Sequence, residues 1–148
     1  MDERDAPEAF LEVFENRVRF AETDQQGIVF YGEYVTYQDE AVTAFLREIG
    51  YDYDAIRDAA WDIHVVSTEL NYRHPARFED VLVNEVRVAR VGESSVEFDY
   101  RARRKRDDRP IVDGAVTHVA VDEETGSPIR VPEEFREAVA DVRDDSGG

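Results

Sequence analysis

The chain has 148 residues and a mass of 17.0 kDa, and its 35 acidic against 18 basic side chains give a formal net charge of −17. This length is usual for one domain, and 42% hydrophobic residues suffice for one packed core. The acidity excludes nucleic acids and anionic membranes as expected partners, because both require a basic surface. A salt-rich cytoplasm, whose ions screen self-repulsion, would explain this charge and the single lysine, Lys105; the alternative is a chance acidic surface.

Neither a membrane span nor a secretory leader is expected, because the apolar runs are short and Met1 is followed by charged residues. The lack of cysteine excludes disulfides and thiolate chemistry, which fits a reducing compartment. We therefore expect a cytoplasmic protein. The one basic cluster, residues 101–106, is followed at once by two aspartates, which favours a solvated strand face and a turn over a binding site.

Residues 13–20 alternate between charged side chains and apolar or amide ones, a period of two that predicts a strand. After a turn that contains a glycine, apolar residues recur every three or four positions from Tyr34 to Ile49, which predicts a helix of about four turns. Gly50 stands where a left-handed cap would end this helix. We expect it to be the only long helix in the body of the domain.

The rest of the chain returns mainly to strand patterns, with charged and apolar residues alternating most clearly in the third segment. Short turns at residues 92–93 and 107–110 favour antiparallel hairpins. The predicted strands are residues 63–72, 81–91, 95–103 and 111–121.

Pro132 marks the first turn of a short terminal helix, and residues 144–148 are expected to fray. The predicted fold class is therefore α+β, with a curled antiparallel sheet wrapped around one long helix. We expect a single domain over residues 1–148, ordered over about residues 10–140, with a short acidic tail after residue 143.

Two connecting segments carry a resemblance to a known family. Residues 24–34, DQQGIVFYGEY, lead from the first strand into the helix, and residues 71–80, NYRHPARFED, lead from one strand into the next. Both are similar to signature segments of the hotdog-fold acyl-CoA thioesterases, specifically the 4-hydroxybenzoyl-CoA thioesterase family. The similarity extends over about residues 18–132, and the order of the elements agrees with it. The resemblance thus implies a hotdog fold and hydrolysis of an acyl-CoA to a free acid and CoA.

The resemblance implies that Asp24 is the catalytic carboxylate, as nucleophile or as general base on water, and that the backbone N–H of Tyr31 polarises the thioester carbonyl. A helix N-terminus suits that task, because its unpaired donors and partial positive charge face an oxygen that becomes negative. Gly27 would permit the tight turn between them. The alternatives are an Asx turn for Asp24 and a place in the core for the Tyr31 ring.

Contacts with the substrate are implied at two places, the start of the helix and the turns where relatives bind the nucleotide of CoA. Phosphate groups there require arginine side chains or helix-end amides. The residues implied are Phe30, Gly32 and Tyr34 at the helix start, and Arg90, Ser94 and Arg130 near the nucleotide.

The family resemblance further implies a homodimer with the active site at its interface, pairing again into a tetramer, and no metal or redox cofactor. His64, His74 and His118 have no metal-like spacing, so packed or turn positions are expected. Glu40, near where some hotdog enzymes place their acid, is expected at the surface or an interface. Three questions stay open: whether the acyl group is aromatic, and whether the chain is instead a hotdog hydratase or a non-catalytic acyl-thioester binder. A hydratase would need a histidine, and none lies beside the helix start in the sequence.

Overall fold

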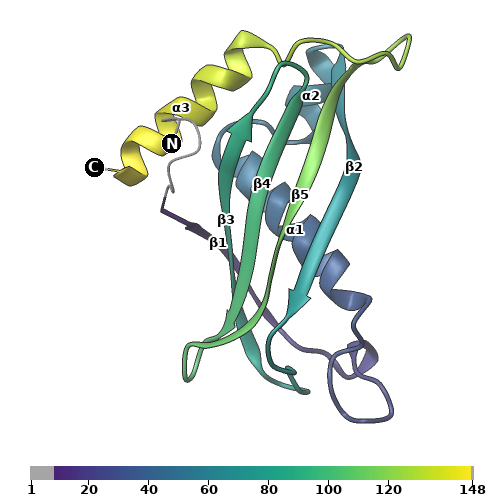
Figure 1. Cartoon of the computed structure of the whole chain (residues 1–148), viewed down its shortest axis with the longest axis vertical. Helices are drawn as coiled ribbons and strands as arrows, with labels where there is room; N and C mark the ends of the chain where they lie inside the picture. Colours follow the sequence, from purple (N-terminus) through teal and green to yellow (C-terminus); the bar gives the residue numbers. More distant parts are fainter. Residues whose placement is uncertain (1–8, 148) are drawn as a thin grey trace.

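The computed structural model describes residues 9–147 as an antiparallel sheet with one long helix against its inner face (Figure 1). The sheet has five strands in the order β1-β3-β4-β5-β2, so β1 and β2 form its edges. This architecture confirms the predicted fold class. The strands are β1 (Leu11–Arg17), β2 (Trp61–Tyr72), β3 (Val81–Val91), β4 (Ser95–Arg104) and β5 (Arg109–Asp122), and the helices are α1 (Glu33–Glu48), α2 (Tyr53–Asp58) and α3 (Glu133–Gly147).

The core lies between α1 and the inner face of the sheet. Tyr37, Ala41 and Phe45 share one side of α1, and each is at most 2% exposed. The Phe45 ring meets Phe98 of β4 edge-on, with 5.8 Å between the ring centroids. The apolar residues that alternate along β4 are all buried, as predicted. α1 ends where expected, because Gly50 adopts the left-handed conformation with φ +86°.

The first strand is shorter than predicted. β1 ends at Arg17, and the chain then forms a 3₁₀ turn over Phe20–Glu22. The backbone of Val18 explains the change of direction, because its N–H donates to the Asp80 carbonyl and its own carbonyl accepts from Glu79. The chain is thereby drawn toward the segment that precedes β3.

Two helices also differ from the predictions. α2 was not predicted; it begins after Asp52, whose side chain accepts a hydrogen bond from the Ala55 N–H and caps it. α3 continues to Gly147, through most of the segment that was expected to fray, and no proline interrupts that stretch. Gly148 lies outside the described residues.

α1 lies toward one side of the sheet. It packs mainly against β1, β3 and β4 and contacts β2 less closely, through Gln38 and Tyr34, whereas β2 packs mainly against β5 and the short α2. The inner face of β2 is therefore open, with Val65 52% and Tyr72 51% exposed. Because β2 is an edge strand, it pairs with β5 alone in the described part of the chain.

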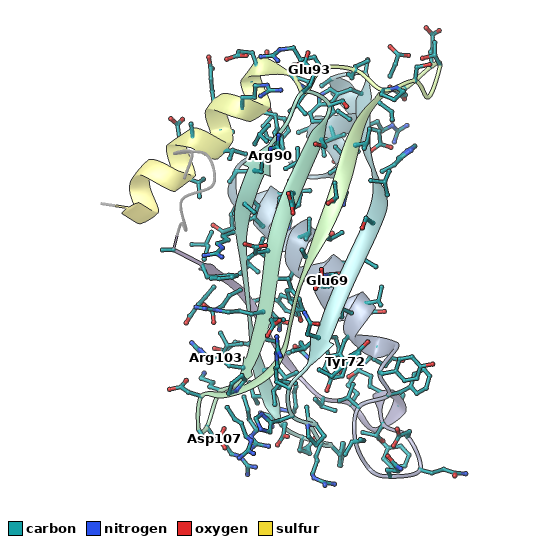
Figure 2. The ribbon with its side chains drawn as sticks, in the orientation of Figure 1. Glu69, Tyr72, Arg90, Glu93, Arg103 and Asp107 are labelled. Carbon is teal, nitrogen blue, oxygen red and sulfur yellow. The ribbon has the colours of Figure 1, made fainter. Side chains whose placement is uncertain are left out.

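The outer face of the sheet carries paired charges. Arg87 and Asp99 approach to 2.8 Å, and Arg101 lies 3.1 Å from Glu85. Arg103 and Asp107 lie at the β4–β5 turn (Figure 2), where residues 101–106 form the strand face and turn that were predicted. Among residues 9–147, no helix is long and apolar enough to cross a lipid bilayer.

Candidate active site

Asp24 opens a tight loop between the 3₁₀ turn and α1. The Asp24 N–H donates to the Ile28 carbonyl at 2.9 Å, and the Gly27 N–H donates to the Asp24 carbonyl at 2.9 Å. Gly27 has φ +76°, which a residue with a Cβ adopts only with strain. Asp24 Oδ1 accepts the Gln26 N–H at 2.8 Å, so the Asx turn is formed. Its Oδ2 accepts nothing from residues 9–147, which leaves one carboxylate oxygen available for chemistry.

The backbone donors at the start of α1 are free. The carbonyl of Phe30 accepts the Glu33 N–H at 2.9 Å, which closes the first turn. Within residues 9–147, however, no group accepts a hydrogen bond from the N–H of Tyr31 or Gly32. Both donors stand at the positive end of the helix. The Tyr31 side chain is 65% exposed, so the alternative that placed its ring in the core is wrong.

A cavity of about 270 Å³ opens beside this helix end, lined chiefly by aromatic and apolar side chains. Tyr31 and Tyr34 form one wall, and Tyr72 at the end of β2 forms another. The Tyr72 hydroxyl donates to the Tyr31 carbonyl at 3.4 Å. Burial raises the pKa of Tyr34 to about 12, which keeps its hydroxyl protonated at neutral pH. Phe30 and Gly32, which were predicted to contact the substrate, do not line this cavity.

A histidine also lines the cavity. His74 lies among its walls, although no histidine stands beside the helix start in the sequence. The ring Nδ1 is 2.9 Å from the Pro110 carbonyl oxygen. Because a carbonyl only accepts, Nδ1 carries the hydrogen in this bond, and Nε2 bonds to no group among residues 9–147.

A buried carboxylate anchors the loop to α1. Glu22 is 7% exposed and accepts hydrogen bonds from the Arg19 N–H at 2.8 Å and the Tyr37 hydroxyl at 2.9 Å. Burial acts to raise the pKa of Glu22, but these bonds and the Arg19 guanidinium outweigh it and lower the pKa overall. The Glu22 carbonyl also accepts the Phe30 N–H at 2.9 Å. Glu22 therefore ties both ends of the Asp24 loop to the helix.

Residues 18–139 match a known family, the thioesterase-like superfamily. That match includes the Asp24 loop, α1 and all of β2 to β5. The chain belongs to the thioesterase-like superfamily.

Individual members of the superfamily are similar over nearly their whole length. Acyl-CoA thioesterase YbgC of Haemophilus influenzae is 27% identical over 127 residues, which cover 84% of this chain and 91% of that protein. The 1,4-dihydroxy-2-naphthoyl-CoA hydrolase of Synechococcus elongatus is 21% identical over 126 residues, again 84% and 91%. A hypothetical protein of Thermus thermophilus with a crystal structure is 30% identical, with a TM-score of 0.80, over 88% of this chain and 98% of that one.

In this thioesterase-like chain, the residues predicted to bind the nucleotide lie away from the cavity. Arg90 lies near the opposite end of the sheet from Tyr72 (Figure 2). Arg130 is paired with Glu93 at 2.8 Å, beside the β3–β4 turn that contains Ser94. A single chain does not bring these residues together with the Asp24 loop, so their contact with the nucleotide stays a prediction.

The sequence assigned no role to three residues that the fold brings into or beside this thioesterase-like site. Tyr72 and His74 belong to the segment that carried the family resemblance, and that segment was the available signal. Glu22 gave none, because an acid in a turn is ordinarily exposed. Within the described residues, no three histidine, aspartate or glutamate side chains gather as a metal site requires.

Proposed function

We propose that the protein hydrolyses acyl-CoA thioesters to a free acid and CoA. The observation that carries this proposal is the free N–H of Tyr31, at the start of α1 and beside a cavity lined by aromatic side chains. A thioester carbonyl placed there would accept this hydrogen bond, which strengthens as the oxygen becomes negative. Membership of the thioesterase-like superfamily supports the same reaction.

Asp24 would supply the second half of the chemistry. As a general base, its free Oδ2 would take a proton from water while that water adds to the carbonyl carbon. The carbon–sulfur bond then breaks, and the CoA thiolate leaves and takes up a proton. As a nucleophile, Asp24 would add to the carbonyl carbon and displace the CoA thiolate, and water would then open the resulting acyl anhydride to the free acid and the Asp24 carboxylate. Both routes use the same oxygen, and both leave Oδ1 to hold the turn.

The cavity favours an aromatic acyl group. The rings of Tyr31 and Tyr72 meet edge-on with 6.5 Å between their centroids, and Tyr34 and Tyr72 lie 5.6 Å apart. Such walls stack well on a flat ring. The Synechococcus relative named for a dihydroxynaphthoyl-CoA and the family resemblance to 4-hydroxybenzoyl-CoA thioesterases support this substrate class.

We further propose that the protein acts as a homodimer joined along β2. This edge strand exposes Val65 and Val66 by 52% and 60%, and its outer backbone groups are available to pair with a second copy. Val66→Asp would place a charge in that interface and should yield a monomer. Light scattering coupled to size exclusion would measure the mass, and a dimer that survives the substitution would refute this interface.

The decisive experiment compares Asp24→Asn with the wild type for release of free thiol from aromatic and aliphatic acyl-CoAs. Asparagine keeps an Oδ1 acceptor for the Gln26 N–H, so the turn should survive while the base is lost. We expect kcat to fall by about 100- to 10,000-fold. The matched control is Asp52→Asn, which removes one charge and keeps the cap of α2.

The results distinguish the roles of Asp24. A folded Asp24→Asn variant that keeps full activity would refute Asp24 as the catalytic group. If Asp24→Asn stays active and only Asp24→Ala loses activity, the role of Asp24 is to hold the turn. A single turnover of the wild type in ¹⁸O-labelled water tests for the nucleophilic route, because label appears in the Asp24 carboxylate only when water opens the anhydride at the Asp24 carbonyl.

A second candidate function follows from His74. His74 lines the same cavity as Tyr31, its Nε2 bonds to no group among residues 9–147, and hotdog hydratases pair an acid with a histidine. Under this alternative the protein adds water across an enoyl thioester and leaves the carbon–sulfur bond intact. Loss of the conjugated enoyl chromophore without release of thiol, abolished by His74→Gln, would establish it. Release of thiol without hydration would exclude it.

A further inference from the structure

A second, smaller cavity lies farther along α1, over the open inner face of β2. It has a volume of about 60 Å³ and is lined by four valines together with Gln38, Asp39, Thr68 and His118. On α1 it begins at Val35, four residues after Tyr31, and on β2 it includes Thr68, four residues before Tyr72. The two cavities therefore follow one seam between α1 and β2.

His118 is the buried polar group of this second cavity. It lies on β5 opposite Val65 of β2, and it is only 6% exposed. Its Nδ1 is buried and has no hydrogen-bond partner among residues 9–147. The ring contacts Phe98 edge-on at 5.4 Å, which supplies packing and no polar partner. A buried ring nitrogen without a partner is costly, so a group that occupies the cavity and bonds to it would be favoured.

The other polar groups of the cavity already have partners. The Thr68 hydroxyl donates to Gln38 Oε1, and Gln38 Nε2 reaches the Glu69 carbonyl at 3.5 Å. Asp39 is exposed to solvent. Burial lowers the pKa of His118, so at neutral pH its ring is uncharged and offers one donor and one acceptor. This pair matches a hydroxyl group, which can both accept and donate.

We propose that the second cavity receives the far end of the acyl group and that His118 hydrogen-bonds a hydroxyl carried there. This inference rests on the proposed thioesterase function and makes His118 a specificity-determining residue. The helix rise places Val35 and Gln38 about 6 to 10 Å beyond Tyr31 along the axis of α1. The hydroxyl must therefore lie at a comparable distance from the thioester carbon, as on the far side of one aromatic ring or of two fused rings.

The test measures kcat/KM for pairs of acyl-CoAs that differ by one hydroxyl: benzoyl- with 4-hydroxybenzoyl-CoA, and 2-naphthoyl- with 6-hydroxy-2-naphthoyl-CoA. We expect the wild type to prefer the hydroxylated member of at least one pair by about 10-fold. His118→Leu should reduce that preference to about 2-fold or less, whereas His118→Gln, which still hydrogen-bonds, should keep most of it. The matched control is His64→Leu, because His64 is exposed on β2 and lines neither cavity.

Each outcome decides a separate point. If the wild type releases thiol and His118→Leu keeps the wild-type preference, the inference about His118 is wrong and the thioesterase function stands. If no acyl-CoA releases thiol, the proposed function fails and this inference fails with it. Should His118→Leu not fold, ¹⁵N NMR of the wild-type ring decides. The His118 signals must shift with the hydroxylated product acid and stay still with the unhydroxylated acid; equal responses would overturn the proposal.

Discussion

Replacing Tyr37 with phenylalanine would remove one hydroxyl from the network that anchors the Asp24 loop. This hydroxyl donates to Glu22 Oε1 at 2.9 Å, and both residues are buried, with Tyr37 1% and Glu22 7% exposed. Phenylalanine preserves the packing of the ring against Tyr34, so the lost hydrogen bond is the main change. Glu22 would retain its bonds to Arg19 and remain partly satisfied.

The expected loss of stability follows from the charge of the acceptor, the Glu22 carboxylate. A hydrogen bond to a charged group contributes about 1.5–3 kcal/mol, so we expect Tyr37→Phe to lower the free energy of unfolding by about 2 kcal/mol. For a chain of this length, the midpoint of thermal unfolding should fall by about 4–8 °C. Because Glu22 also holds Phe30 at the helix start, kcat should fall by about 10- to 100-fold through misplacement of Asp24.

Urea unfolding and thiol release measure the two effects. The folded-state pKa of Glu22 is lowered, so its stabilising contribution is full above the unfolded value near 4.3 and is lost as the pH falls through the folded pKa. The stability difference between wild type and Tyr37→Phe should therefore shrink in acid. Tyr51→Phe is the control, because the Tyr51 hydroxyl has no hydrogen-bond partner among residues 9–147. The anchoring role of Glu22 would be refuted if Tyr37→Phe and Tyr51→Phe lost equal stability. It would also be refuted if the stability difference between the wild type and Tyr37→Phe did not depend on pH.

Three further predictions concern stability. Gly114→Ala should cost about 1–3 kcal/mol in urea unfolding, because a Cβ there would lie 1.9 Å from the Glu69 carbonyl oxygen; an unchanged midpoint would contradict the close approach of β2 and β5. Burial lowers the pKa of His118 despite the opposing charge of Asp39, so the His118 ring binds a proton more readily in the unfolded chain than in the folded one. The stability of the wild type relative to His118→Leu should therefore fall as the pH drops below about 6.5. Raising KCl from about 0.1 to about 1 M shortens the screening length from about 10 to about 3 Å and should raise the thermal midpoint; no response would argue that the net charge of −17 does not limit stability.

The fold was largely predictable because its main elements carry local periodicity. The three- and four-residue spacing from Tyr34 to Ile49 and the alternation of β4 each follow from a face that is buried. α2 was not found, since six residues around one buried side chain, Ile56, give too short a pattern. The offset of α1 toward β1 was also beyond prediction, because it depends on packing between distant segments.

The candidate site was also predictable only where its residues are close together in the sequence. Asp24, Gly27 and Tyr31 lie within eight consecutive residues, so one segment suggested them together. Tyr72 and His74 join Tyr31 only because β2 ends beside the start of α1, a contact that no spacing in the sequence reveals. Burial accounts for the remaining differences. Buried Glu22 accepts the Tyr37 hydrogen bond that anchors the loop, and Nδ1 of the His118 imidazole is buried without a partner among residues 9–147.

The displacement of α1 from β2 separates the parts of the molecule that maintain the fold from the parts that would choose a substrate. Side chains under the helix are packed on all sides, so most substitutions there would cost stability. Val65 is 52% exposed along the seam, and changes at such a position usually alter the free energy of unfolding by less than about 0.5 kcal/mol. The acyl group accepted by this scaffold can therefore change through substitutions on one strand while the Asp24 loop and the helix end stay as they are.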